Sequence, residues 1–87
     1  MIFEWDNNKS ASNKQKHGIS FEDVHKLWDD ALRVEIQAAF PDEKRHILIG
    51  KMERKVWTAI YTMRGESIRI ISVRPARDKE KRLYEQG

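Results

Sequence analysis

The chain contains no cysteine and no long apolar run. Without cysteine, neither a disulfide framework nor a thiolate metal site can stabilise a domain of this size. The absence also fits a reducing compartment, and we expect the protein in the cytoplasm. Apolar runs such as Ile47–Gly50 and Ile68–Val73 are too short to span a bilayer, so we expect no membrane association. The first residues carry neither the basic nor the apolar segment of a signal peptide, which predicts that none is present.

Several site patterns are missing as well. The histidines, His17, His25 and His46, lack the paired spacing of zinc ligands. The sequence has no glycine-rich phosphate loop and no Ser-His-Asp spacing typical of hydrolases. We therefore expect no bound metal and no cofactor. Because no internal repeat, low-complexity tract or linker interrupts the chain, residues 1–87 are predicted to form a single domain.

Positive charge is in slight excess and is concentrated in two places. Lysine and arginine number 17 against 14 acidic residues, which gives a net charge of +3. The segments 9–17 and 69–82 are locally basic, whereas 21–30 is mildly acidic. Clustered cations favour a polyanionic partner, whereas dispersed cations form an ordinary solvated surface. Composition therefore leaves nucleic-acid binding open.

The first third of the chain predicts a short strand and two helices. A strand over 2–5 is followed by Asp6, whose carboxylate suits the N-cap of a polar helix over 7–17. Gly18 is expected to end this helix in the left-handed conformation. Ser20 and Asp23 predict a capping box for the second helix. That helix places four apolar residues on one face for docking on a sheet: Phe21, Val24, Leu27 and Trp28.

The rest of the chain predicts strands and then one more helix. The strands cover 32–40, 45–52, 56–63 and 68–73, with turns at Pro41-Asp42, 53–55 and 64–66. Such short loops indicate consecutive antiparallel hairpins, and 78–85 suits a C-terminal helix. The predicted fold class is therefore α+β. It has two N-terminal helices, an antiparallel meander of about four strands plus a short N-terminal strand, and a C-terminal helix.

Two arginines of the last strand are candidates for chemistry. Arg69 and Arg74 are an odd number of positions apart, so a regular strand would direct them to opposite faces. Because of Pro75, strand pairing is expected to stop near Val73 and to leave Arg74 free to reach either face. Arg69 needs a carboxylate or phosphate partner. The alternative is an arginine at the sheet rim that pairs with a nearby carboxylate, Glu66 or Glu35.

The C-terminal helix and His17 each allow a structural and a chemical interpretation. Leu83 and Tyr84 are expected to form the docking side of the helix. Glu80 belongs to its first turn, where the helix dipole favours a carboxylate, and we prefer this role over general-base chemistry. A cationic imidazole is favoured at the C-terminal end of the first helix, which accounts for His17. His17 is also a candidate for proton transfer if the Lys9–His17 face borders the cleft of the arginines.

Both ends of the chain resemble the BrnT toxin family. Residues 3–22, FEWDNNKSASNKQKHGISFE, follow the family pattern F-E-W-D-x-x-K-x-x-x-N-x-x-K-H-G-[VI]-S-F-E. Residues 69–84, RIISVRPARDKEKRLY, resemble its ending R-I-I-S-A-R-x-A-x-x-x-E-x-x-x-Y. Two long gapped signatures in the correct order are far more specific than any single motif above. The resemblance spans nearly the whole chain.

This resemblance implies a type II toxin with a RelE-like fold. Such a toxin is a ribonuclease that inhibits translation, and it is neutralised by an antitoxin that carries a ribbon-helix-helix type DNA-binding part. The toxin–antitoxin complex represses its own operon, so operator DNA is contacted only through the complex. The alternatives from the residues alone are a non-catalytic basic module that binds nucleic acid or an antitoxin, and a structural subunit of a complex.

The resemblance also assigns roles to residues. RelE-like ribonucleases let the RNA 2′-hydroxyl attack the adjacent phosphate without a metal, which requires cations for the developing charge and a group that moves protons. The catalytic candidates are Arg69 and Arg74 for phosphate, His17 for proton transfer, and Glu80 and Tyr84 as second-line residues. The candidates for RNA binding are Lys9, Lys16, Arg77, Lys81 and Arg82.

The chain departs from the family pattern at both ends. Asn7 stands where the family often has proline, which weakens the start of the first helix. Pro75 and Arg77 stand where a basic residue and then a threonine or serine are common. The resulting loss of a Thr-x-x-Glu capping box predicts that the last helix begins at Asp78. Asp78 also adds a negative charge near the arginines that are expected to bind phosphate.

Overall fold

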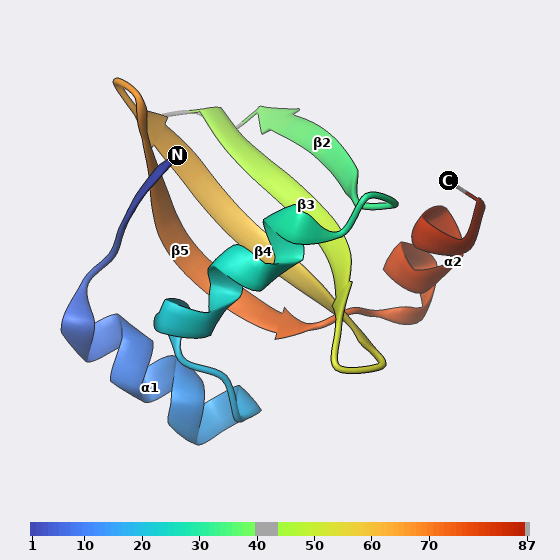
Figure 1. The fold of residues 1–87 in the computed structure, drawn as a ribbon, viewed down its shortest axis with the longest axis horizontal. Coiled ribbons are helices and arrows are strands. Elements are labelled where there is room, and N and C mark those ends of the chain that lie inside the picture. The colour runs from blue at the N-terminus through green and yellow to red at the C-terminus, as the bar shows by residue number, and fades with distance from the viewer. Residues whose placement is uncertain (40–43, 87) are drawn as a thin grey trace.

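A computed structural model describes residues 1–39 and 44–86 of the chain. The predicted α+β class is confirmed, and along the chain one strand is followed by two helices, four strands and a last helix (Figure 1). The elements are β1 (Ile2–Glu4), α1 (Asn7–His17), the 3₁₀ helix η1 (Phe21–Asp29), β2 (Val34–Ala39), β3 (Lys44–Met52), β4 (Lys55–Arg64), β5 (Ser67–Pro75) and α2 (Asp78–Gln86).

The five strands form one mixed sheet in the order β1-β5-β4-β3-β2. Strands β2 to β5 make the predicted antiparallel meander, and β1 adds to β5 in parallel, which the sequence did not indicate. The β3–β4 turn is tight because Glu53 and Arg54 both adopt positive φ, 52° and 69°. The turn predicted at Pro41-Asp42 lies outside the described residues.

The capping residues predicted for α1 are confirmed. The Asp6 carboxylate accepts hydrogen bonds from the backbone N–H groups of Asn8 and Lys9, at 2.8 and 3.2 Å. Gly18 adopts the left-handed conformation with φ 80°, and its N–H donates to the Lys14 carbonyl. Each contact satisfies a backbone group that the helix end leaves unpaired. The helix therefore begins and ends where its sequence predicts.

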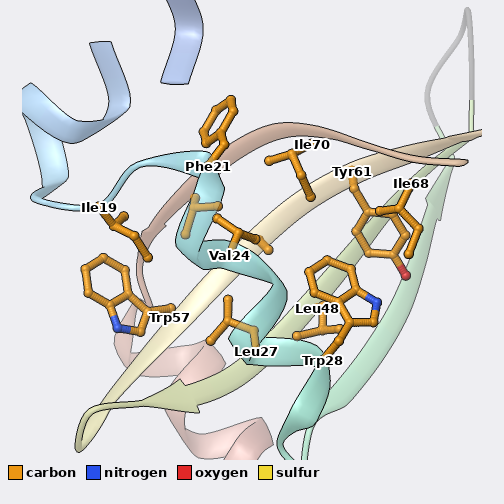
Figure 2. Close-up of a cluster of buried hydrophobic side chains, with 12 residues drawn as sticks. Ile19, Phe21, Val24, Leu27, Trp28, Leu48, Trp57, Tyr61, Ile68 and Ile70 are labelled. Carbon is orange, nitrogen blue, oxygen red and sulfur yellow. The ribbon is translucent and has the colours of Figure 1, made fainter. Parts of the chain in front are cut away.

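The second helix docks as predicted but differs in type. Phe21, Val24, Leu27 and Trp28 are all buried against the sheet, and Figure 2 shows them facing sheet residues such as Leu48, Tyr61 and Ile70. The capping box predicted for Ser20 and Asp23 is wrong, because the Ser20 side chain makes no capping bond. The Asp23 N–H donates instead to the Ser20 carbonyl at 3.3 Å, as a 3₁₀ turn requires.

A β-bulge decides which face of the sheet the two arginines occupy. Between Ile60 and Tyr61 of β4 the register shifts, so Ile71 is an extra residue on β5. Leu48, Ala59 and Val73 face η1 and are fully buried. Arg69 pairs with Thr62 and Arg74 with Thr58, one position from residues that face η1. Both arginines therefore lie on the face opposite η1, and not on opposite faces as a regular strand without a bulge would place them.

Pairing of β5 continues past the point where the sequence predicted its end. Arg74 pairs with Thr58 and Pro75 with Trp57, and the Ala76 N–H donates to the Val56 carbonyl at 3.0 Å. Successive backbone N–H groups of a strand point in opposite directions within the sheet. Since the Ala76 N–H points towards β4, the missing N–H of Pro75 would have pointed away from it. Proline therefore removes no bond of this ladder.

Candidate functional site

One face of α1 carries most of the polar candidates from the opening signature. Lys9, Ser12, Asn13, Lys16 and His17 follow one another at intervals of three, one, three and one residues, which places them on one side of a helix. Together with Phe21, Ile71 and Ser72 they line a cavity of about 200 Å³, which we call the α1–β5 cavity. No carboxylate is among these lining residues.

Buried polar side chains hold α1 against β5. The Asn13 amide donates to the Ile19 carbonyl at 2.9 Å and accepts the Val73 N–H at 3.3 Å. The Ser10 hydroxyl accepts the Phe21 N–H at 2.9 Å. Ser10 and Asn13 are the buried residues of α1. The polar stripe of α1 thus faces β5 because these bonds fix the rotation of the helix.

The β5 wall of the cavity is the bulge itself. Ile71 and Ser72 line it, and both are half-buried. A bulge bends its strand and redirects the side chains beside it. Helical spacing in the sequence could have identified Ser12 and Asn13 as neighbours of the cations. No sequence signal indicates that Ser72 would face them, because the bulge depends on how β4 and β5 pair.

Some of the predicted site residues line the cavity, but the two arginines do not. Lys9, Lys16 and His17 come together, with both lysines exposed and His17 half-buried. Two ammonium groups, an imidazole and two serine hydroxyls form a set that suits a phosphate. Arg69 and Arg74 do not line the cavity, although Ser72 lies between them on β5.

Arg74 makes the strongest ion pair among the described residues that carry candidate roles. Its Nη1 and Nη2 donate to Glu80 Oε1 and Oε2 at 2.7 and 2.9 Å, a bidentate geometry. Glu80 Oε1 also accepts the Arg77 N–H at 2.8 Å. The Arg74 hydrogen bonds, together with the Arg77 N–H, lower the pKa of Glu80 to about 2. The predicted first-turn position of Glu80 and the start of α2 at Asp78 are confirmed.

Arg69 has a different partner from the two that the sequence suggested. Its Nη1 lies 3.5 Å from Glu4 Oε1, because the parallel register of β1 and β5 pairs Glu4 with Arg69. The prediction of Glu66 or Glu35 is therefore wrong. Glu35 accepts from the Tyr61 hydroxyl at 3.3 Å and pairs with Arg33. Its neighbour in β3 is Leu48, which faces η1, so Glu35 lies on the other face of the sheet from Arg69.

The remaining candidates lie on α2, away from the cavity. The Tyr84 hydroxyl donates to Asp30 Oδ2 at 2.6 Å, and this bond raises the pKa of Tyr84 to about 12. The docking side predicted for the helix is confirmed for Tyr84, which is half-buried, but not for Leu83, which is 38% exposed. Within α2 no residue is fully buried, and polar contacts hold the helix in place. Arg77, Lys81 and Arg82 are exposed, and their RNA-binding role stays a prediction.

The family assignment follows from a match over most of the chain. The sequence model of a family described as the ribonuclease toxin BrnT of type II toxin–antitoxin systems matches residues 5–80. The chain belongs to the BrnT family. The matched range covers the whole α1–β5 cavity as well as Arg69, Arg74 and Glu80, and it ends before Tyr84. A search of curated proteins returned no match. Membership implies an RNA target and an antitoxin partner.

Within residues 1–39 and 44–86, no group of three or more histidine, aspartate or glutamate side chains is arranged to hold a metal ion. In the same part of this BrnT-family chain, neither α1 nor any other helix has the length and apolar character needed to cross a bilayer.

Proposed function

We propose that this BrnT-family chain is an endoribonuclease toxin that cleaves RNA at the α1–β5 cavity and thereby inhibits translation. The observation that carries the proposal is the convergence of Lys9, Lys16 and His17 on one cavity whose lining contains no carboxylate. Cations without a neutralising acid attract a phosphodiester, and an imidazole nitrogen can accept a proton or donate one. This combination of groups fits a site that cleaves RNA better than it fits a purely structural subunit of a complex.

The proposed reaction is attack by the RNA 2′-hydroxyl on the adjacent phosphorus. The bond from phosphorus to the 5′-oxygen of the next nucleotide breaks, and the products are a 2′,3′-cyclic phosphate and a 5′-hydroxyl. A proton leaves the 2′-hydroxyl and another reaches the departing 5′-oxygen, and the His17 imidazole is the proposed proton-transfer group. Lys9 and Lys16 stabilise the extra negative charge of the pentacoordinate phosphorus. The Ser72 hydroxyl is available as an additional donor.

The arginines have a supporting role in this proposal. Arg69 and Arg74 lie on the sheet face opposite η1, on either side of Ser72 along β5, and each is already paired with a carboxylate. The guanidinium N–H groups that Glu80 and Glu4 leave unused bind flanking phosphates of the RNA. Glu80 and Tyr84 act by fixing α2 to Arg74 and Asp30. The exposed cations of α2 steer RNA towards the cavity.

Cleavage of a defined RNA in EDTA tests the proposal. We expect cleavage to persist in EDTA and to stop when the ribose at the cleaved position is replaced by 2′-deoxyribose. His17→Ala should reduce the rate by about 10²- to 10⁴-fold. His25→Ala is the matched control, because His25 is exposed and does not line the cavity. Equal activity of the two variants, or no cleavage at any ratio of protein to RNA, would contradict the proposal.

Binding without cleavage is the competing outcome. A non-catalytic basic module would bind the same RNA, with the logarithm of its affinity falling by about 0.7 per phosphate contact for each logarithmic unit of salt. A complex insensitive to salt would point to a protein partner. We further propose that the antitoxin carries a ribbon-helix-helix part and that operator DNA is bound only by the complex. Gel shifts with the chain alone and with the complex test this.

A further inference from the structure

α1 lacks the apolar side chains that usually anchor a helix to a sheet. Its one apolar residue, Ala11, is exposed, and its buried residues are Ser10 and Asn13. A helix that is polar all round is stable only when its neighbours hold it. The position of α1 therefore depends on the hydrogen bonds of these two side chains. This matters because α1 carries Lys9, Lys16 and His17, the groups proposed to bind phosphate and transfer protons in the α1–β5 cavity.

Asn13 joins α1 to β5 immediately beside the bulge. Its Oδ1 accepts the N–H of Val73, the residue that follows Ser72, and its Nδ2 donates to the Ile19 carbonyl. Because one partner is a donor and the other an acceptor, the two bonds fix the orientation of the amide. Ser10 differs, since its hydrogen bond runs to the Phe21 N–H at the start of η1 and not to β5.

We propose that Asn13 is a positioning residue of the ribonuclease site. It holds His17 and the cavity lysines at the distance from Ser72 that cleavage requires; this inference rests on the proposed function. Asn13 lies one helical turn after Lys9 and one turn before His17, so any rotation or shift of α1 moves both groups relative to the bulge. Its amide is engaged with two backbone groups, so it acts through its neighbours and not on the RNA.

Steady-state kinetics separate this role from a general loss of stability. Asn13→Ala is expected to lower kcat by about 10²-fold, because misplacement of catalytic groups by about 1 Å has an effect of that size. KM should change by less than about threefold, because the lysines that attract RNA remain. Ser10→Ala is the matched control, since it removes a buried hydrogen bond of the same helix that does not reach β5. All proteins are compared below their melting transitions.

Equal kcat losses in the two variants at equal losses of melting temperature would overturn the proposal. If Asn13→Ala does not fold, Asn13→Ser takes its place, because the serine hydroxyl can still bond one of the backbone groups that Asn13 satisfies. We expect the same loss of kcat for Asn13→Ser. A double-mutant cycle gives an independent test. If Asn13 acts through His17, the Asn13→Ala change should reduce the remaining rate of the His17→Ala protein by less than about threefold. Independent, multiplicative losses would contradict the positioning of His17 by Asn13.

A spectroscopic measurement tests the geometry without any activity. The ring Cε1–H signal of His17 in a ¹H–¹³C spectrum should move in Asn13→Ala and stay in place in Ser10→Ala. An unmoved signal in Asn13→Ala would overturn the inference even if the protein cleaves RNA. A moved signal in a protein that cleaves no RNA would retain the structural role of Asn13 and reject the proposed function.

Discussion

The Arg74–Glu80 pair makes a quantitative prediction about stability and pH. Glu80→Gln keeps the size of the side chain but removes the charge that Arg74 binds through two hydrogen bonds of 2.7 and 2.9 Å. Both side chains are largely shielded from water, with 19% of Arg74 and 16% of Glu80 exposed. The interaction is therefore screened far less than a pair on the open surface.

The magnitude follows from the pKa of Glu80. Binding to Arg74 lowers this pKa from 4.5 to about 2. Each pKa unit corresponds to about 1.36 kcal/mol, so the charged form contributes about 3 kcal/mol to the free energy of unfolding. Because the folded-state pKa is depressed, this stability is fully present above pH 4.5 and is lost as the pH falls towards 2. Asp30 also titrates at low pH, but it is present in both proteins and cancels in their difference.

Urea denaturation followed by tryptophan fluorescence measures the effect at a series of pH values. We expect Glu80→Gln to be less stable than wild type by about 3 kcal/mol at pH 7, with the difference shrinking below pH 4.5 and vanishing near pH 2. Glu85→Gln is the matched control, because Glu85 is exposed on the same helix; it should change stability by less than about 0.5 kcal/mol. A stability difference that does not change with pH, or a Glu80→Gln protein as stable as wild type at pH 7, would show that the Arg74–Glu80 charge pair does not stabilise the fold.

Two other changes test the contacts that shape the fold. Gly18→Ala should destabilise the protein by about 1 to 2 kcal/mol in urea denaturation, because Gly18 has φ 80° and a side chain disfavours that conformation; an unchanged midpoint would show that the corner between α1 and η1 relaxes freely. Tyr84→Phe removes the 2.6 Å bond to Asp30 and should cost about 1 kcal/mol, since Asp30 keeps the N–H groups of Leu32 and Lys51. An equally stable Tyr84→Phe protein would show that this bond does not secure α2.

Local sequence patterns determined most of the elements. Asp6 and Gly18 set the ends of α1 through the backbone groups they satisfy, and both act within a few residues. The apolar period of Phe21, Val24, Leu27 and Trp28 identified the docking face of η1 without determining its helical type. Glu80 was placed correctly in the first turn of α2 for the same reason, because a helix terminus is a local feature.

The pairing of segments that are distant in the sequence could not be predicted from such local patterns. The partner of Arg69 is Glu4, which is 65 positions away in the chain and is selected by the parallel register of β1 and β5. The shared face of Arg69 and Arg74 results from one extra residue at the bulge, and a shift of one residue reverses every side chain beyond it. Sequence spacing within β5 contains no information about that shift.

Local patterns along the chain predict the α+β class, the ends of α1 and the apolar face of η1. Its two long signatures carry the BrnT resemblance, which the family match over residues 5–80 confirms. Folding is needed to bring Lys9, Lys16 and His17 together with Ser72 in one cavity, while both arginines are held by carboxylates outside it. The difference lies in the sequence distance over which each feature is set. Caps and helical faces depend on neighbours within a turn or two, whereas the cavity depends on the Asn13 bond to Val73 and on the β4–β5 register, which only the folded chain brings together.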